Sequence, residues 1–189
     1  TYPATVTVSA VTGVTYHVSV TLTLSASEPF DLDLLLEDPT GRAVMLLSDV
    51  GPSGIHVGSW ANTVMTLDDC APRALRSGLN PPGRYRPSNY LPGDVMDAPA
   101  PGLSYGNTLA EFNQVSPNGT WKLYARDDSF GNFGTSSIES WSLTIFAQPA
   151  LPPPDFYYGL NPVSCSGPDY DGDGRTDVAV YRPETGEWF

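Results

Sequence analysis

The sequence predicts an all-β chain, with a jelly-roll-like β-sandwich of about seven to nine strands and a short β-hairpin at the C-terminus. Three observations support this fold class. Apolar and polar residues alternate with a period of two through much of residues 1–147, as in strands that pack on a core from one side. Turn-forming Gly, Pro, Asn and Asp residues separate these stretches. No segment sustains the periodicity of a long helix.

The expected strands follow one another along the chain with turns between them. In order, they cover residues 5–9, 18–24, 31–36, 44–47, 64–67, 121–125 and 141–145. The turn signals lie at residues 38–41, 52–54, 81–83, 117–119 and 131–132. One short helical turn is expected at residues 108–113. Short strands with this punctuation are typical of a sandwich or jelly roll.

The charge balance narrows the class of partner. Asp and Glu number 21 against 9 Lys and Arg, which gives a formal net charge of −12. Nucleic acids and anionic membranes both attract basic surfaces, so neither is expected as a partner. No apolar run is long enough to cross a bilayer, so no membrane insertion is expected. An acidic chain fits a secreted, cation-rich setting, and we expect an extracellular or cell-surface location.

A proline-rich stretch divides the chain. Residues 148–154 read Gln-Pro-Ala-Leu-Pro-Pro-Pro. Prolines lack an amide donor and favour an extended backbone, so this stretch is expected to be a semi-rigid linker. The expected parts are therefore a β-sandwich over residues 1–147, a linker over 148–168 and a short motif over 169–189.

The C-terminal part contains an acidic loop, Asp-Tyr-Asp-Gly-Asp-Gly-Arg-Thr-Asp, at residues 169–177. Side-chain oxygens come from Asp169, Asp171, Asp173 and Asp177, and Arg175 offers its backbone carbonyl. Ca²⁺ binds such sets of oxygens, and the two glycines let the backbone curl around it. The loop lacks the final glutamate of an EF-hand, and a strand-like stretch follows it. We therefore predict a calcium loop within a β-hairpin; the alternative is a solvated acidic turn.

The sandwich offers a second candidate cation site. Asp31 and Asp33 are two residues apart in an expected strand, so their side chains are predicted to share one face. Asp49 ends the next expected strand and could join them across the turn. The alternative is that these are ordinary solvated or turn-forming aspartates.

Two cysteines, Cys70 and Cys165, make up the whole cysteine content. They lack the spacing of a metal site, and an even pair in an exported protein favours a disulfide. The bridge would close a loop of about 95 residues and stabilise the fold by roughly 4–5 kcal/mol in the chain-entropy model. The alternative is two free thiols.

Motifs in a fixed order run through residues 3–147. They are Asp-Leu-Asp-Leu-Leu-Leu-Glu-Asp-Pro-Thr-Gly (31–41), Val-Met-Leu-Leu-Ser-Asp (44–49), Val-Met-Thr-Leu-Asp-Asp (64–69), Tyr-Arg-Pro (85–87), Asn-Gly-Thr-Trp-Lys-Leu-Tyr (118–124), Asp-Asp (127–128) and Trp-Ser-Leu-Thr-Ile (141–145). This series resembles the P domain, the β-sandwich that follows the catalytic domain of subtilisin-like proprotein convertases. The resemblance implies a module that packs on a neighbouring protease and stabilises it without contributing catalytic residues. Secreted bacterial proteins also carry such modules away from any protease.

The last 21 residues, 169–189, carry a second resemblance. Asp-Tyr-Asp-Gly-Asp-Gly-Arg-Thr-Asp followed by Val-Ala-Val-Tyr-Arg-Pro-Glu-Thr-Gly-Glu-Trp-Phe is similar to the opening of an FG-GAP or VCBS repeat, the unit of integrin-type β-propellers. The resemblance implies that the aspartates bind Ca²⁺ between two strands. It also implies a propeller as a neighbouring domain, because one repeat cannot close a propeller alone.

No catalytic constellation stands out in the sequence. His17 and His56 are the two histidines, and neither belongs to a motif for nucleophilic catalysis. Gly-Thr-Ser at 134–136 lacks the Met, Ala and Pro that follow in the subtilase nucleophile turn. Zinc ligands at suitable spacing are lacking, and no carboxylate pair is singled out for glycoside hydrolysis. We therefore expect no catalytic residues here, although the parent protein could be, or associate with, a serine endopeptidase.

The expected function is that of a non-catalytic accessory module of a secreted bacterial protein. It would bind Ca²⁺ and stabilise or dock a neighbouring domain of the same polypeptide, either a protease or a propeller. The alternative is a cell-surface adhesion module that binds a surface glycan or a protein through loop aromatics. The aromatic residues expected in loops are Trp60, Tyr85, Tyr90, Tyr105, Phe130 and Phe133. Otherwise these aromatics would cover the ends of the sandwich.

Overall fold

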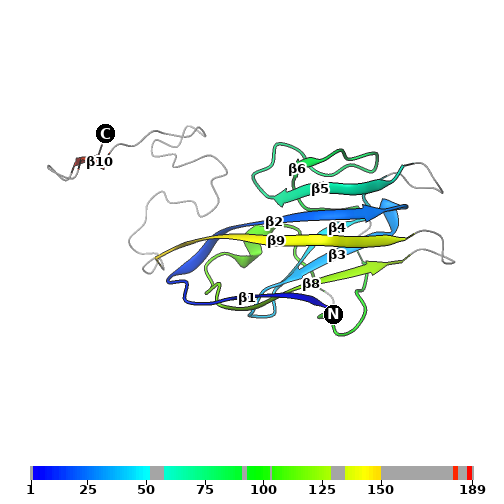
Figure 1. The fold of residues 1–189 in the computed structure, drawn as a ribbon. Helices are drawn as coiled ribbons and strands as arrows, with labels where there is room; N and C mark the ends of the chain where they lie inside the picture. Colours follow the sequence, from blue (N-terminus) through cyan, green and yellow to red (C-terminus); the bar gives the residue numbers. More distant parts are fainter. Residues whose placement is uncertain are drawn as a thin grey trace. The chain divides into compact units, whose positions relative to one another are not determined.

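The strands of the N-terminal region form two sheets (Figure 1). Their apolar side chains form a shared core. The computed structural model describes residues 2–51, 58–90, 93–102, 104–128, 135–149, 181–182 and 187–188. The chain separates into two units, Thr1–Ala150 and Leu151–Phe189, each described by itself. The first unit is an all-β sandwich, as the sequence predicts. No helix among the described residues is both long and apolar enough to cross a membrane.

The first sheet has the strand order β1-β8-β3-β4-β7, and the second has the order β6-β5-β2-β9. The strands of the first sheet are β1 (Ala4–Val8), β3 (Leu32–Glu37), β4 (Ala43–Ser48), β7 (Ser88–Asn89) and β8 (Gly119–Asp127). Those of the second are β2 (Val14–Ala26), β5 (Trp60–Asp68), β6 (Gly83–Tyr85) and β9 (Ser136–Gln148). Neighbours pair antiparallel, except that β7 runs parallel to β4 and β6 runs parallel to β5.

The core lies between the two sheets. In β2, every second residue from Val18 to Leu24 is fully buried and faces the core. The residues between them lie on the other face of the strand. Trp121 of β8 packs edge-on against Phe112, with ring centroids 5.1 Å apart. Its indole Nε1–H donates to the carbonyl oxygen of Pro117 at 2.9 Å. The core therefore follows from the period-two pattern, and the largest side chain also has its polar atom satisfied.

Two short 3₁₀ turns accompany the strands. η2 (Leu109–Phe112) lies at the short turn that the sequence predicts and puts Phe112 in the core. Asp69 accepts hydrogen bonds from the backbone N–H groups of Leu109 and Ala110 at 3.0 and 2.8 Å. η1 (Pro29–Asp31) precedes β3. The strand expected from residue 31 therefore begins one residue later, because proline opens a turn that includes Asp31.

A short segment connects an edge strand of one sheet to an edge strand of the other. β6 forms one edge of the second sheet, and β7 forms one edge of the first. The two strands are separated in the chain only by Arg86 and Pro87. Neither strand was expected from the sequence, because each is too short to show a period-two pattern.

The second unit contributes a short strand pair among its described residues. β10 (Tyr181–Arg182) pairs antiparallel with β11 (Glu187–Trp188). The predicted calcium loop at 169–177 lies outside the described residues, so that prediction stays as it was made.

Candidate cation site

Asp33 is the centre of the candidate site, and strand β3 determines where its side chain lies. Side chains alternate between the two faces of a strand, and Leu32, Leu34 and Leu36 belong to the core between the sheets. Asp33 and Leu35 are therefore on the outer face of the five-stranded sheet. That face is covered, since Leu35 packs in a second apolar cluster and Asp33 is only 2% exposed.

The segment that covers this face supplies Asp94. Met96 packs in the same cluster as Leu35. Next to it, the guanidinium of Arg126 donates from Nη1 to the carbonyl oxygen of Val95 at 2.7 Å. Asp94 immediately precedes these two anchored residues, so its carboxylate is held beside β3.

Asp128, which follows β8, completes a group of three carboxylates with Asp33 and Asp94. Its backbone N–H donates to the carbonyl oxygen of Asp31 at 2.9 Å, which extends the β3–β8 ladder beyond the Leu32–Asp127 pair. One carboxylate oxygen from each of Asp33, Asp94 and Asp128 lies within 4.8 Å of the other two. Two ligands on opposite sides of one Ca²⁺ are about 5 Å apart, so this spacing suits a single ion.

Ser48 and Asp49 border the group at the end of β4. The Ser48 hydroxyl lies 3.0 Å from Asp94 Oδ2 and 3.1 Å from Asp49 Oδ2. A hydroxyl has one proton, so it can donate to only one of these carboxylates at a time. Asp49 has φ +54, a left-handed conformation that aspartate tolerates better than most residues. Burial raises the pKa of Asp49, and Asp94 and Asp128 raise it further against the hydrogen bond from Ser48.

One oxygen of the Asp33 carboxylate, Oδ2, lacks a hydrogen-bond partner within the described residues, whereas Ser48 is close enough to hydrogen-bond the carboxyl group. This Oδ2 is buried. Burial raises the pKa of Asp33 to about 7, and the charges of Asp128, Asp94 and Asp49 add to the effect while Ser48 opposes it. A buried carboxylate oxygen without a partner is costly, and a proton or a cation would relieve that cost.

Basic side chains do not provide the missing charge. Within the part of the chain that the structure describes, no Lys or Arg forms an ion pair with these aspartates. Arg126 lies opposite Asp33 in the β3–β8 register, but its guanidinium is directed to the Val95 carbonyl. Positive charge at this site must therefore come from outside the described residues or be replaced by protons.

The predicted site of Asp31, Asp33 and Asp49 is only partly brought together. Asp33 and Asp49 are close enough to influence each other's charge. Asp31 ends η1, and it stands next to Glu28 and the Asp127–Asp128 pair instead. The pKa of Asp31 is raised to about 6, chiefly by burial. A hydrogen bond with Glu28 and the negative charges of Glu28, Asp128 and Asp127 contribute to this rise.

Asp94 and Asp128 are the candidate ligands that sequence reasoning did not join to Asp33. The Asp127–Asp128 doublet was visible at the end of an expected strand. Its meeting with Asp33 depends on β8 pairing beside β3, which no local pattern encodes. Asp94 follows Pro92 and Gly93 in a loop, and its sequence carries no metal-ligand spacing.

The chemistry of the group favours a hard divalent cation. All the donors are carboxylate or hydroxyl oxygens, which suit Ca²⁺ or Mg²⁺ and not the soft metals that prefer thiolate or imidazole. Ligands on a strand, a loop and a strand end can adapt to the larger and more flexible shell of Ca²⁺. Magnesium requires a stricter octahedron.

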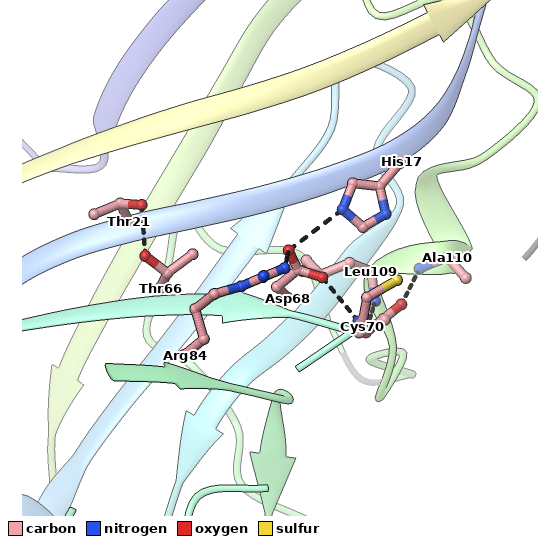
Figure 2. A network of polar contacts seen from close by, with 9 residues as sticks. His17, Thr21, Thr66, Asp68, Cys70, Arg84, Leu109 and Ala110 are labelled. Atoms are coloured by element: carbon pink, nitrogen blue, oxygen red, sulfur yellow. Dashed lines mark hydrogen bonds and ion pairs between the residues drawn. The ribbon is translucent and has the colours of Figure 1, made fainter. Parts of the chain in front are cut away.

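A second polar group lies around Asp68 on the other sheet (Figure 2). A ring nitrogen of His17, a carboxylate oxygen of Asp68 and the sulfur of Cys70 are also within 4.8 Å of one another. Cys70 is disulfide-bonded, so its sulfur is not a thiolate ligand. The other cysteine of the sequence, Cys165, lies outside the described residues, and the Cys70–Cys165 pairing stays a prediction.

The aromatic residues expected in loops divide into two kinds. Trp60 and Tyr85 are 4% and 2% exposed and belong to the core, which corrects their assignment to exposed loops. The glycines and prolines around them conceal that Trp60 opens β5 and Tyr85 closes β6. Tyr90 is 46% exposed. The Tyr105 hydroxyl donates to the Pro101 carbonyl at 2.9 Å.

Several predicted residues cannot be compared with the structure. Asp169, Asp171, Asp173, Arg175 and Asp177 lie outside the described residues. The same holds for His56, Phe130 and Phe133.

Comparison with known proteins does not assign the chain to a family. No family model matches the sequence, and no curated protein and no solved structure matches it.

Proposed function

We propose that the β-sandwich is a non-catalytic accessory module of a secreted bacterial protein, related to the P domain, which binds Ca²⁺ and stabilises or docks a neighbouring domain. One observation carries the calcium part of the proposal: the buried Asp33 Oδ2 has no hydrogen-bond partner and lies in a group with Asp94 and Asp128. The motif order through residues 3–147 supports the resemblance to the P domain.

Calcium would act here as a bridge between segments. Asp33 is in β3, Asp128 follows β8 and Asp94 is in the loop over their outer face. A shared ion would neutralise carboxylates that otherwise repel one another. It would also fix the loop, because opening the loop would remove a ligand. A module stiffened in this way presents a constant surface to a neighbouring domain, which lowers the entropic cost of docking.

Calorimetric titration of the EDTA-stripped chain with Ca²⁺ tests the proposal. The D171A/D173A variant serves as the background, so that the predicted loop at 169–177 does not contribute heat. We expect one binding event in this background and its loss when Asp33→Asn or Asp128→Asn is added. Asp97→Asn is the matched control, because Asp97 is an exposed aspartate in the same covering loop.

Two outcomes of this titration would contradict the proposal. If the D171A/D173A background gives no heat and its melting temperature is the same in Ca²⁺ and EDTA, the sandwich does not bind calcium. If D33N and D97N bind Ca²⁺ equally well, any calcium bound is held elsewhere.

A further inference from the structure

One stretch of this chain carries positive charge without any negative charge. Residues 70–93 contain four of the nine Lys and Arg residues and no Asp or Glu. The other five basic residues share the rest of the chain with all 21 acidic ones. The four residues of this arginine surface are Arg73, Arg76, Arg84 and Arg86. On a protein with a net charge of −12, such segregation marks a surface of opposite sign.

The fold brings the segment of Arg73 beside the end of β6. The backbone N–H of Arg86 donates to the carbonyl oxygen of Arg73 at 2.8 Å, and Ala74 forms a parallel bridge with Arg86. Tyr85 is buried, so Arg84 and Arg86, its neighbours on either side, point to the opposite face of the strand. Arg73 lies on the Tyr85 side, so the arginines flank the edge strand β6 from both faces. Side chains two residues apart on a strand are roughly 7 Å apart at their origins.

The fold also holds three of the guanidinium groups in place. Arg84 Nη2 lies 2.6 Å from Asp68 Oδ2, and Arg86 Nη1 donates to the carbonyl oxygen of Ala71 at 2.9 Å. The guanidinium carbon of Arg73 lies 5.0 Å from the centre of the Tyr85 ring. Groups that are fixed before binding lose less entropy on binding, and a planar guanidinium has donors left for a second acceptor.

Most of this positive charge is not neutralised within the sandwich. All four arginines are exposed. In the described ranges, Arg84 alone has a carboxylate partner, and Arg73, Arg76 and Arg86 form no ion pair. Nearby acidic side chains are thus not using these guanidinium groups, and the surface suits a partner that brings carboxylates at intervals.

An exposed tyrosine lies beside the arginines. The Tyr90 hydroxyl donates to the carbonyl oxygen of Leu75 at 2.7 Å, which ties the ring to the segment between Arg73 and Arg76. Tyr90 as a whole is 46% exposed. A sugar ring can pack on such an aromatic face, whereas a protein partner would need a larger set of apolar anchors. Leu79 is the other large apolar side chain exposed in the described part of this stretch.

We propose that the arginine surface binds a uronic-acid polysaccharide. The carboxylates of such a chain recur along a stiff backbone, and fixed guanidinium groups can bind them with paired hydrogen bonds. Tyr90 would contact the sugar rings between the charges. Nucleic acid is disfavoured, because its dense phosphates would be repelled by the remaining acidic surface. Tyr90 adjoins the border of the carboxylate group, since its backbone N–H donates to the carbonyl oxygen of Ser48 at 3.3 Å, but the proposal uses the arginines and does not depend on calcium.

Affinity electrophoresis and calorimetry with polygalacturonate oligomers test this proposal. Both are run in EDTA, so that neither the cation site nor calcium-linked polysaccharide contributes. We expect binding that weakens with salt, no binding to neutral dextran, and at least about tenfold weaker binding of the R73Q/R76Q variant. The control is Arg42→Gln, since Arg42 is also exposed but contacts only the carbonyl oxygens of Glu111 and Asn113. An unchanged melting temperature shows that R73Q/R76Q is folded.

Other outcomes would overturn the assignment. Equal affinity of the native chain and R73Q/R76Q would place any binding elsewhere, and no binding of polygalacturonate would end the proposal. Equal or tighter binding to polyglutamate, dextran sulfate or DNA would show an unselective attraction to polyanions instead of a uronate site. All these results leave the calcium titration unaffected, so the two proposals fail independently.

Discussion

Arg84 and Asp68 form an ion pair across the parallel strands β5 and β6, with Nη2 and Oδ2 2.6 Å apart (Figure 2). The Asp68 side chain is 4% exposed. It also accepts a bond from the backbone N–H of Cys70 at 2.8 Å, and His17 Nε2 lies 3.4 Å away. Burial alone would raise the pKa of Asp68, but Arg84, the Cys70 N–H and His17 together hold that pKa below its ordinary value.

Asp68→Asn tests how much this carboxylate stabilises the sandwich. The amide can still accept from Cys70, but the charge that pairs with Arg84 is lost. Because the Arg84 side chain is 57% exposed and can turn to water, we expect a loss of about 1–3 kcal/mol in the free energy of unfolding. Urea denaturation measures it, with the exposed Asp97→Asn as the control. A D68N chain as stable as D97N would contradict a stabilising role.

Asp33→Asn is expected to stabilise the metal-free protein. The substitution removes a buried charge, and the amide can donate to Asp94 or Asp128. In EDTA at pH 8 we expect its melting temperature to rise by roughly 2–8 °C, which corresponds to about 1–2 kcal/mol. In the D171A/D173A background, calcium should raise the melting temperature when Asp33 is present and not when Asp33→Asn is added. A lower melting temperature for D33N in EDTA would mean that the native carboxylate has a stabilising partner.

The stability of the metal-free chain should fall as the pH rises. The pKa of Asp33 is raised to about 7 and that of Asp31 to about 6, against an ordinary value of 3.8. The folded state therefore binds these protons more tightly than the unfolded state. The stabilisation that results is complete below about pH 4 and is lost by about pH 7. Ionised Asp33 then faces the carboxylates of Asp49, Asp94 and Asp128.

Thermal scans in EDTA across this pH range measure the effect. D33N should lose stability only up to about pH 6, where Asp31 has ionised, and Ca²⁺ should reverse the fall in the wild type. The depressed pKa of Asp68 has the opposite sign: its contribution is present above pH 3.8 and is lost as the pH falls through its lower folded pKa. A wild-type profile that rises between pH 5 and pH 7 would contradict the assignment of Asp33.

The predicted disulfide between Cys70 and Cys165 can be tested by thiol titration of the denatured, unreduced chain. We expect no free thiol. Reduction, or the C70S/C165S variant, should lower the free energy of unfolding by roughly 4–5 kcal/mol, because a long loop is no longer closed in the unfolded chain. Two titratable thiols per chain would contradict the pairing. A disulfide-linked dimer on a non-reducing gel would assign Cys70 to another copy.

Sequence patterns predicted the strands well where one face is buried and the other is not. Val18 to Leu24 show this, because their alternation matches the burial in β2. The same reasoning missed the covered outer face of β3, where Asp33 is buried although it alternates with leucines. It also missed the core positions of Trp60 and Tyr85. A period of two identifies the two faces of a strand, but only the tertiary structure shows whether a loop covers the second face.

The candidate site was predictable only in part for a related reason. The sequence drew attention to Asp33 in β3 and to Asp49, which directly follows β4. It could not supply Asp94 and Asp128, because the β3–β8 pairing and the packing of Met96 bring distant segments together. Asp31 was expected on the face of Asp33, and Pro29 removes it from the strand.

The short parallel strands β6 and β7 have a consequence for the order in which the sandwich assembles and opens. A parallel pair cannot be closed by a tight turn, so β6 and β7 can add only to sheet edges that already exist. Together they span Gly83–Asn89 and fasten one sheet to the other. Detaching this strip separates the sheets along one side and leaves the long β2–β5 and β3–β8 ladders whole. Amide hydrogens of the strip should therefore exchange through a partial opening, well before those of β2 and β3.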